Sequence, residues 1–573
     1  MRKVNFNLRH ALLLLLAAVC AVLILSAITA CNSGKSVKYF TVEYVAGEGG
    51  YIDGETEQVV ESGKDCTAVT AVSSEGYIFT GWSDGVETAE RQDGEISEDL
   101  TVTALFAKEY WSVTYTSNNY LACNLTEPDE YTVKHGETTS ITVEPVLGYK
   151  FVGWSDGVTA PTRTDDYTKD GQTIEAIFEM DFINLPVISI DTDGKAITSK
   201  EDYVDCTVSL LNVDDEYLLD ELVAGIRLRG NSTFNLSKKP YRIKFDKKQS
   251  PFGWEKNKSW VLLALYLDYS NIKDYAARVF ANAIGTEAFV PNAQHVEVYL
   301  NGTYQGLYLF TDQVSEHKGR TNVEDEDFFD TDSVEVPFLV EWDEYSPKEG
   351  PEDEVWFKIE NSDITSYYNV KYPEFDDGYN YTQEQFEYIK NYIITVNDIC
   401  RNPDVTQAEF EEWIDLPAFI DYYLIQEVMS NGEVNKKSVF MSRAVGGKLV
   451  MGPLWDFDWG AGGPIGRFGG VDYQGKTVVQ KWRSSTNWFA YMLKVDWFKE
   501  KVIARWDEIT SLLLETVDEL VAFKPEIEAV AKRNAIRWEQ NKTGQFTDFD
   551  EYYDWVVDYM KLRIEIISGL LAD

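Results

Sequence analysis

The sequence predicts a multidomain protein in which two small β-rich repeat modules precede one larger α+β domain. The first observation is an internal repeat, since residues 77–86 (YIFTGWSDGV) return as residues 149–158 (YKFVGWSDGV). The second is a change of pattern after Pro186, where alternating strands give way to strands mixed with amphipathic helices. We therefore expect a signal segment (1–30), a tether (31–37), two β modules (38–108 and 109–180) and a large domain (186–570).

The N-terminus has the features of an export signal. Arg2, Lys3 and Arg9 precede an apolar run over residues 11–28. The run ends in Ile-Thr-Ala-Cys31, which resembles a bacterial lipobox. The resemblance implies cleavage before Cys31, lipidation of its thiol and an extracytoplasmic protein that is lipid-anchored to the cell membrane. An uncleaved anchor helix is the alternative, because the run is nearly long enough to span a bilayer.

Composition excludes several classes of function. The chain has 573 residues, with 52 Lys+Arg against 96 Asp+Glu, and its net charge of -44 repels nucleic-acid phosphates. With 44% hydrophobic and 14% aromatic residues, it has enough apolar side chains to build folded cores. The sequence lacks the H-E-x-x-H, G-x-S-x-G and G-x-x-x-x-G-K-[ST] motifs of zincins, many serine hydrolases and P-loop NTPases.

The repeats read as small β modules. Each opens with an alternating strand (residues 40–44 and 111–115) and closes with another (100–106 and 173–178). Their shared G-W-S-D-G segment resembles the internalin-B-type (Listeria–Bacteroides) repeats of bacterial surface proteins, which implies a spacer or an adhesive module. We expect Trp82 and Trp154 to be core residues of the modules rather than ligand contacts.

Local signals define elements of the larger domain. A helix is expected to begin at Ser270-Asn271 and to end before Gly285 in the C′ position. Asn301-Gly302, between two alternating runs, predicts a tight β-hairpin. Residues 381–430 and 495–570 have mostly helical spacing.

Two neighbouring segments have the chemistry of a phosphate site. Arg227 and Arg229 share one face of a strand that runs into the small-residue turn 230–233 (GNST), where backbone N–H groups would lie beside guanidinium groups. The strand that follows carries Arg242 and Lys244 on one face, with Lys239 just before them in the sequence. The alternatives are arginines paired with the acidic surface and an edge strand kept soluble by lysine.

A third segment has the chemistry of a cation site. Residues 448–458 (KLVMGPLWDFD) read as a strand that ends in Asp456 and Asp458, which point the same way if the segment is extended. Paired carboxylates bind Mg²⁺ together with substrate phosphates. A helix cap or a structural Ca²⁺ site is the alternative.

These parts occur in the order found in protein kinases, and residues 186–570 resemble the spore-coat protein H (CotH) kinase family. The resemblance therefore implies an atypical protein-kinase-like fold for the α+β domain. It rests on segments 227–233, 239–245, 258–264 with Asp268, 297–306 and 452–458.

The resemblance implies a kinase that uses ATP and Mg²⁺ to phosphorylate serine in other proteins, here an unknown protein of the cell surface. It places Glu433 and Lys244 in the catalytic machinery, and Asp456, Asp458 and Ser438 around the metal. It assigns the nucleotide to Arg227, Arg229, Gly230, Asn231, Ser232, Lys239 and Lys244.

Two residues depart from the kinase pattern. Glu433 stands where the catalytic loop would have Asp, and Ser438 stands where it would have a metal-binding Asn, a role that Asn431 or Asn435 is chemically able to take. A misplaced carboxylate costs on the order of 100-fold in rate. The alternative function is therefore a non-catalytic surface scaffold or adhesin. A glycoside hydrolase fits less well, because Asp456 and Asp458 are too close in sequence to flank a glycosidic bond.

Overall fold

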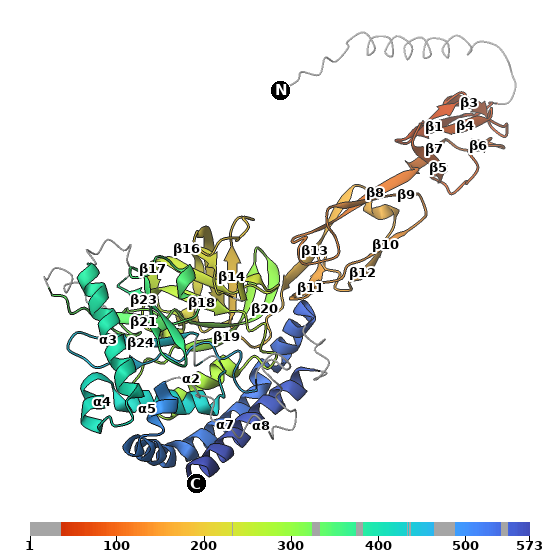
Figure 1. Cartoon of the computed structure of the whole chain (residues 1–573). Helices are drawn as coiled ribbons and strands as arrows, with labels where there is room; N and C mark the ends of the chain where they lie inside the picture. The colour runs from red at the N-terminus through yellow and green to blue at the C-terminus, as the bar shows by residue number, and fades with distance from the viewer. Residues whose placement is uncertain are drawn as a thin grey trace. The chain divides into compact units, whose positions relative to one another are not determined.

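The computed structural model describes residues 36–231, 233–323, 333–373, 382–432, 434, 437–462, 488–539 and 548–572. The chain divides into two compact units (Figure 1). The first takes the residues up to Asn118 together with Glu127–Val143 and Gly153–Ile177. The second takes Asn119–Thr126, Glu144–Val152 and Phe178–Asp573. Among the described residues, no helix combines the length and the apolar character that crossing a membrane requires. The apolar run and Cys31 lie outside those residues.

Each repeat is built from two sheets, with strand orders β3-β1-β7-β5 and β2-β4-β6 in the first and β11-β13-β8-β9 and β10-β12 in the second. The opening and closing strands of each repeat pair in parallel, β1 with β7 and β8 with β13. The first repeat contains β1 (Tyr39–Ala46), β2 (Gly50–Asp53), β3 (Glu57–Glu61), β4 (Val69–Ser73), β5 (Tyr77–Trp82), β6 (Glu90–Arg91) and β7 (Leu100–Lys108). The second contains β8 (Tyr110–Ser117), β9 (Asp129–Lys134), β10 (Thr139–Thr142), β11 (Tyr149–Trp154), β12 (Thr162–Asp165) and β13 (Gln172–Met180).

A buried arginine explains the repeated G-W-S-D-G segment. In the first repeat the Arg91 guanidinium lies 4.7 Å from the ring centroid of Trp82 and pairs with Asp84 (3.0 Å) and Asp93 (2.7 Å). The second repeat has the same contacts among Arg163, Trp154, Asp156 and Asp165. Both tryptophans are 2% exposed, which confirms that they are core residues.

The larger unit begins with a closed barrel of strand order β14-β15-β16-β17-β18-β20-β19. Along each strand every second side chain faces inward, and residues such as Ile226, Ile243 and Tyr308 fill the interior. The barrel strands are β14 (Val187–Asp191), β15 (Val204–Leu211), β16 (Leu219–Leu228), β17 (Tyr241–Gln249), β18 (Asn257–Leu263), β19 (Ala293–Leu300) and β20 (Thr303–Asp312).

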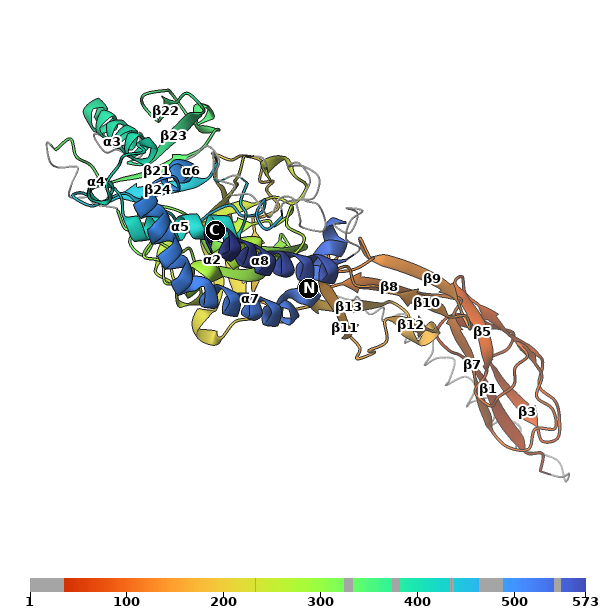
Figure 2. The same cartoon turned by 60° about the horizontal axis from the view of Figure 1, so that its bottom comes forward.

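A second sheet and a set of helices complete this unit. The sheet has the order β22-β23-β21-β24-β25, built from β21 (Phe338–Trp342), β22 (Trp356–Glu360), β23 (Thr365–Tyr372), β24 (Val439–Arg443) and β25 (Val450–Met451). The helices are α2 (Lys273–Ala283), α3 (Gln383–Arg401), α4 (Gln407–Trp413), α5 (Leu416–Val428), α6 (Trp488–Met492), α7 (Asp496–Trp538) and α8 (Phe549–Ala572). Figures 1 and 2 show α7 and α8 side by side, with α5 next to them.

The structure confirms the predicted hairpin and the predicted end of α2, but α2 begins later than expected. Asn301 (φ 49°) and Gly302 (φ 72°) form the turn between β19 and β20, which confirms the hairpin. Gly285 (φ 66°) follows the C-cap of α2, as expected. The helix starts at Lys273 rather than at Ser270, because the Asp268 carboxylate accepts hydrogen bonds from the Ser270 and Lys273 amides (3.0 and 2.9 Å) and holds the preceding turn.

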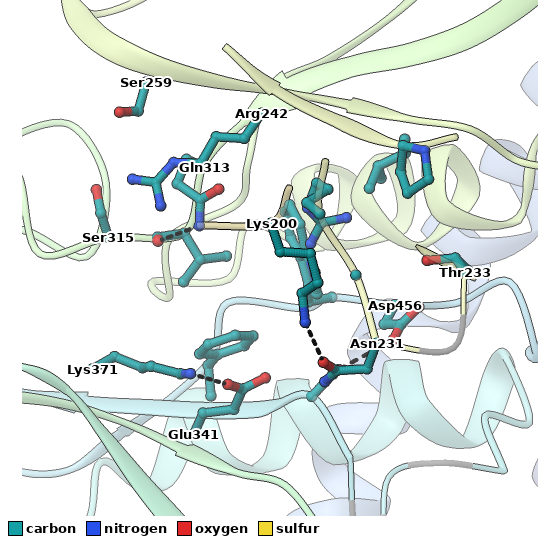
Figure 3. A pocket seen from close by; sticks show the side chains of 18 of the residues that line it. Lys200, Asn231, Thr233, Arg242, Ser259, Gln313, Ser315, Glu341, Lys371 and Asp456 are labelled. Carbon is teal, nitrogen blue, oxygen red and sulfur yellow. Dashed lines mark hydrogen bonds and ion pairs between the residues drawn. The ribbon is translucent and has the colours of Figure 1, made fainter. Parts of the chain in front are cut away.

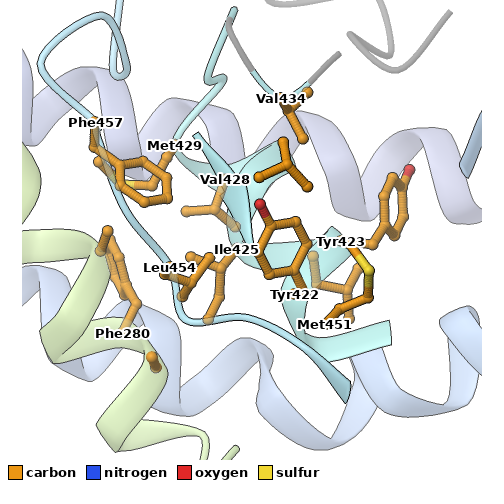
Figure 4. Packing of buried hydrophobic residues seen from close by; sticks show 14 of the residues in the cluster. Phe280, Tyr422, Tyr423, Ile425, Val428, Met429, Val434, Met451, Leu454 and Phe457 are labelled. Carbon is orange, nitrogen blue, oxygen red and sulfur yellow. The ribbon is translucent and has the colours of Figure 1, made fainter. Parts of the chain in front are cut away.

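The core beneath α5 fixes the segment that follows β25. Figure 4 shows Leu454 and Phe457 packed against Phe280 of α2 and against Ile425 and Val428 of α5. Leu454, Trp455 and Phe457 are buried, whereas Asp456 and Asp458 are half-exposed. The apolar neighbours thus anchor the segment and leave both carboxylates at a surface.

Part of the second repeat belongs to the larger unit. The Tyr299 hydroxyl donates to the Gly148 carbonyl (2.6 Å), and the Tyr149 hydroxyl donates to the Gly302 carbonyl. Gly148 (φ 92°) is required there, since a Cβ on it would lie 2.7 Å from the Cβ of Tyr304. Sequence patterns do not predict these contacts, because they join residues 151 and 153 positions apart.

Candidate functional site

A cleft of about 770 Å³ lies in the larger unit and collects most of the residues that the sequence singled out (Figure 3). One wall comes from β16, β17 and β18, and the other from β21, β24 and the segment around Asp456. Of the sequence-predicted residues, it is lined by Arg227, Arg229, Gly230, Asn231, Lys244, Ser438, Asp456 and Asp458.

The charge of this cleft differs from that of the chain. Nine Lys and Arg side chains line it beside eight Asp and Glu, although the whole chain carries -44. The cations are Lys200, Arg227, Arg229, Arg242, Lys244, Lys248, Lys258, Lys371 and Lys437; the acids are Glu201, Asp274, Glu316, Glu341, Asp343, Glu349, Asp456 and Asp458. Such local enrichment of cations in an acidic protein indicates an anionic ligand.

Two guanidinium groups carry most of this argument. Arg229 stacks 5.6 Å from the ring of Trp455, and burial lowers its pKa despite the nearby carboxylates of Asp456 and Asp274. Arg242 buries its Nε without a hydrogen-bond partner in the described part of the chain. Neither side chain forms an ion pair with a described residue. Phosphate oxygens are well suited to satisfy both groups.

Arg227 has a different environment. It lies directly opposite Arg242 in the pairing of β16 with β17. Its guanidinium donates to the carbonyl oxygens of Lys200 and Glu201, the second at 3.3 Å, and lies 4.9 Å from the ring centroid of Tyr203. The neighbouring loop therefore holds the Nη1 atom of Arg227, a residue that also lines the cleft.

The turn after β16, which the sequence analysis assigns to phosphate binding, lies at the cleft. Gly230 has a φ of 85°, and a Cβ there would come within 2.3 Å of the Thr233 Oγ1. The Asn231 Oδ1 accepts a hydrogen bond from Lys200 Nζ over 3.1 Å. Ser232 lies outside the described residues.

The lysines around β17 separate into three environments. Lys244 is exposed and lines the cleft. Lys239 does not line the cleft, and its Nζ donates to the Phe234 carbonyl at 2.8 Å, so the structure does not bring it together with the other predicted nucleotide-binding residues. Lys238 is buried, with Nζ bonded to the Leu307 carbonyl and to Asn534 Oδ1 (2.9 Å), and burial lowers its pKa well below the usual range. The residue of this segment that the site prediction omitted is Arg242, although strand alternation placed it beside Lys244.

The expected metal ligands lie together. The Ser438 Oγ donates to Asp456 Oδ2 at 3.1 Å, and Asp458 lines the same cleft. β25 ends at Met451, so the two aspartates follow it in an irregular segment rather than ending a strand. No group of three or more His, Cys, Asp or Glu among the described residues is arranged to hold a metal alone. The pair still suits Mg²⁺, which takes one or two carboxylates and completes its shell with phosphate and water.

Asp274 supports the same segment from α2. Its Oδ2 accepts a hydrogen bond from the Phe457 amide at 3.3 Å, directly after Asp456. Burial raises the pKa of Asp274 to about 6, with a further contribution from the charge of Asp456. The sequence analysis did not single out Asp274. The feature that marks it in the sequence is a carboxylate in the first turn of a largely buried helix, α2.

The loop between α5 and β24 is described only in part. Glu433 and Asn435 lie outside the described residues, so their predicted roles remain predictions. Asn431 is buried, and its Nδ2 donates to the Asp456 carbonyl over 3.4 Å. This contact joins the loop to the metal segment through the backbone of Asp456, not through the carboxylate.

The sequence analysis did not single out two carboxylates of the cleft, Glu341 in β21 and Asp343 directly after it. Glu341 pairs with Lys371 at 3.1 Å, and burial together with the Glu341 charge raises the pKa of Asp343 to about 7. Both line the cleft (Figure 3 labels Glu341 and Lys371). The available signal was the run Phe338–Trp342, in which a carboxylate interrupts an otherwise apolar strand.

Comparisons with known proteins identify both the repeats and the larger domain. A family model described as CotH kinase protein matches residues 226–567, and one described as divergent InlB B-repeat domain matches residues 40–110 and 114–181. A search of curated protein sequences found no match. A solved structure described as the Helicobacter pylori proinflammatory kinase CtkA is similar at 9% identity and a TM-score of 0.20, over 67% of this chain and 98% of that one. That score is too low to support an argument about the site.

Proposed function

Because the chain belongs to the CotH kinase family, we propose that it is a membrane-tethered, extracellular atypical protein kinase. It would transfer the γ-phosphate of ATP to serine side chains of surface proteins. The observation that carries the proposal is the cleft itself, where Arg229 and Arg242 lie without ion-pair partners among the described residues, in the same cleft as the Asp456 carboxylate. Cations without ion-pair partners, in the same cleft as carboxylates suited to Mg²⁺, match a metal–nucleotide ligand.

The roles follow from position. Arg229, Arg242 and Lys244 are suited to hold nucleotide phosphates, and Asp456 and Asp458 to hold Mg²⁺ with Ser438 orienting the first carboxylate. Bound Mg²⁺ would neutralise phosphate charge as the transferred group shifts toward the acceptor. Phosphoryl transfer depends mainly on such positioning and charge stabilisation.

A proton acceptor is the remaining requirement. The serine hydroxyl loses its proton as its oxygen bonds to phosphorus and the bond from phosphorus to ADP breaks. Glu433 is the candidate from the sequence. Asp343 is a second candidate at the cleft, since its pKa of about 7 lies near the working pH of a general base.

The tether and location are part of the same proposal. Export and lipidation at Cys31 rest on the basic and apolar segments and on the lipobox-like sequence. Replacing Cys31 by Ala tests this: radiolabelled palmitate should enter the wild-type protein and not the variant. Equal labelling of both would remove the lipid anchor from the proposal.

The activity is tested with the full-length chain in detergent micelles. ATP is titrated calorimetrically with and without Mg²⁺ into the wild type, Asp456→Asn and the control Asp404→Asn, whose side chain is exposed outside the cleft. We expect Mg²⁺-dependent binding that only Asp456→Asn loses, with thermal unfolding unchanged. Transfer of radiolabelled phosphate to surface proteins should follow the same pattern.

Binding without transfer would favour the alternative, a non-catalytic surface scaffold or adhesin. The observation that keeps this alternative in view is Ser438, a weaker Mg²⁺ ligand than Asn, bonded to Asp456. No binding by a folded wild type would reject the kinase proposal.

A further inference from the structure

A loop outside the matched family region reaches the cleft. It lies between β14 and β15, and the CotH match begins only at residue 226. The Ser199 carbonyl accepts a hydrogen bond from the Leu228 amide at 2.9 Å, which ties the loop to the end of β16. The Ser199 Oγ accepts hydrogen bonds from the amides of Glu201 and Asp202 (3.0 and 2.9 Å) and closes a tight turn. The loop therefore has a defined conformation beside the turn that follows β16.

Arg227 of β16 also holds this loop in place. Its Nη1 donates to the carbonyl oxygens of Lys200 and Glu201, and its guanidinium lies over the ring of Tyr203. Its ion pair with Glu201 is weak, since that contact is 3.7 Å and the Glu201 side chain is 85% exposed. The guanidinium thus donates its hydrogen bonds to backbone carbonyls of the loop and thereby positions Lys200.

The Lys200 side chain extends into the cleft. Figure 3 shows it reaching Asn231 in the neighbourhood of Asp456. The Nζ–Oδ1 distance to Asn231 is 3.1 Å, and Lys200 forms no ion pair with any residue that the structure describes. An ammonium has three donors, and an amide oxygen satisfies one of them without neutralising the charge. Two donors and a full positive charge are left for an anion.

We propose that Lys200 is a further phosphate-binding residue of the cleft, and that Arg227 is the residue that positions it. The inference rests on the proposed function for the identity of the ligand, the phosphate chain of a nucleoside triphosphate. It changes the role of Arg227, which the sequence assigned to direct nucleotide contact, and it adds a residue from a segment that precedes the matched region.

The test uses calorimetric titration of the full-length chain in detergent micelles with Mg-ATP, adenosine and inorganic tripolyphosphate. The variants are Lys200→Ala, Lys200→Arg and Lys195→Ala, an exposed lysine of the same loop that does not line the cleft. Loss of a charge-assisted hydrogen bond at a partly exposed site should weaken Mg-ATP about tenfold in Lys200→Ala. Adenosine binding and thermal unfolding should not change, Lys200→Arg should keep most of the affinity, and Lys195→Ala should match the wild type.

Failure of the inference and failure of the proposed function give different results. If Lys200→Ala binds Mg-ATP as the wild type does, the role of Lys200 is overturned and the kinase proposal stands. If the wild type binds tripolyphosphate in a Lys200-dependent way but not ATP, the anion site stands and the kinase proposal fails. Binding of neither ligand by a folded wild type rejects both.

A double-mutant cycle tests the positioning role. Arg227→Gln is combined with Lys200→Ala, and Mg-ATP affinity is measured for each variant. If Arg227 acts through Lys200, the double variant should bind as weakly as Lys200→Ala alone. Independent effects that multiply would show that Arg227 contacts the ligand itself and would overturn its positioning role.

Discussion

The Ser438 hydroxyl donates a hydrogen bond to Asp456 Oδ2 across 3.1 Å, and both residues have left-handed backbone conformations, with φ of 52° and 65°. Asp456 is followed by Phe457, whose amide is held by Asp274. The carboxylate expected to bind Mg²⁺ is thus oriented from its side chain and from the backbone after it. Left-handed conformations at non-glycine residues cost free energy and cluster at functional sites.

Replacing Ser438 by Asn should preserve the fold and strengthen Mg²⁺-dependent ATP binding. Asn tolerates a left-handed backbone better than Ser, and its amide oxygen is a better Mg²⁺ ligand than a hydroxyl. Ser438→Val should lower the free energy of unfolding by roughly 1–3 kcal/mol, because it loses the hydrogen bond and puts a β-branched residue at positive φ. Denaturant unfolding and Mg²⁺ titration at fixed ATP measure the two effects. Weaker Mg²⁺ dependence in Ser438→Asn would remove Ser438 from the metal site.

Arg242→Ala should weaken Mg-ATP binding at least about tenfold, because a guanidinium suited to contact phosphate is lost. Its stability should not fall, since the native Nε has no partner among the described residues to lose. Lys239→Ala is the matched control from the start of the same segment, and it should bind ATP as the wild type does because its ammonium bonds the Phe234 carbonyl. Calorimetry of the wild type and the two variants measures Mg-ATP affinity. A larger loss of affinity in Lys239→Ala than in Arg242→Ala would support the assignment of Lys239 to the nucleotide.

Arg563→Met should lower the free energy of unfolding by about 3–5 kcal/mol, because it removes one partner of a buried ion pair. The two side chains are almost fully buried, and Arg563 of α8 donates to both the carboxylate (2.5 Å) and the backbone carbonyl (2.8 Å) of Glu427 in α5. Adding Glu427→Gln should recover part of the loss in urea unfolding. A single variant as stable as the wild type would contradict this account.

His295 should make the protein less stable in mild acid. Burial lowers its pKa from 6.5 to about 4, with a smaller effect from the charge of Arg278, while its Nε2 keeps a 2.7 Å hydrogen bond to the Asn271 carbonyl. Between these values the unfolded chain binds the proton and the folded protein does not. The contribution is therefore complete above pH 6.5 and is lost as the pH falls toward 4, up to about 3 kcal/mol.

The measurement compares wild type with His295→Gln in urea at several pH values. The stability difference between them should shrink from pH 7 to pH 4.5. Carboxyl groups such as Asp343 affect both proteins alike, so their contribution cancels in this difference. The raised pKa of Asp343 favours the folded state in acid, which is the opposite direction to His295. A difference independent of pH would show that His295 titrates alike in both states.

Much of the local structure followed from short-range chemistry. The hairpin at Asn301-Gly302, the end of α2 at Gly285 and the core positions of Trp82 and Trp154 depend on turn conformation and on apolar spacing within one element. The candidate site was predicted in part for the same reason, since Arg227 and Lys244 lie on adjacent strands and Arg229 directly follows the first of them.

The features that the sequence did not predict depend on contacts outside a single strand. Strand parity could not decide between Lys239 and Lys244, because Lys239 precedes β17 and finds its acceptor in the Phe234 carbonyl. Arg227 appeared equivalent to Arg229 in sequence, and only the loop at Lys200 distinguishes them. The acids Glu341 and Asp343 reach the cleft through the second sheet, which no spacing within one segment reveals.

The sequence by itself determined the two repeats, the change to an α+β domain, the identity of the cationic strand and the aspartate pair, because each is written in neighbouring residues. The tertiary structure decided which cations are left without carboxylates, which carboxyl groups have raised pKa values and how the loop at Lys200 joins the cleft. Those properties depend on burial and on partners from other elements, and desolvation and pairing are set only when distant segments pack together.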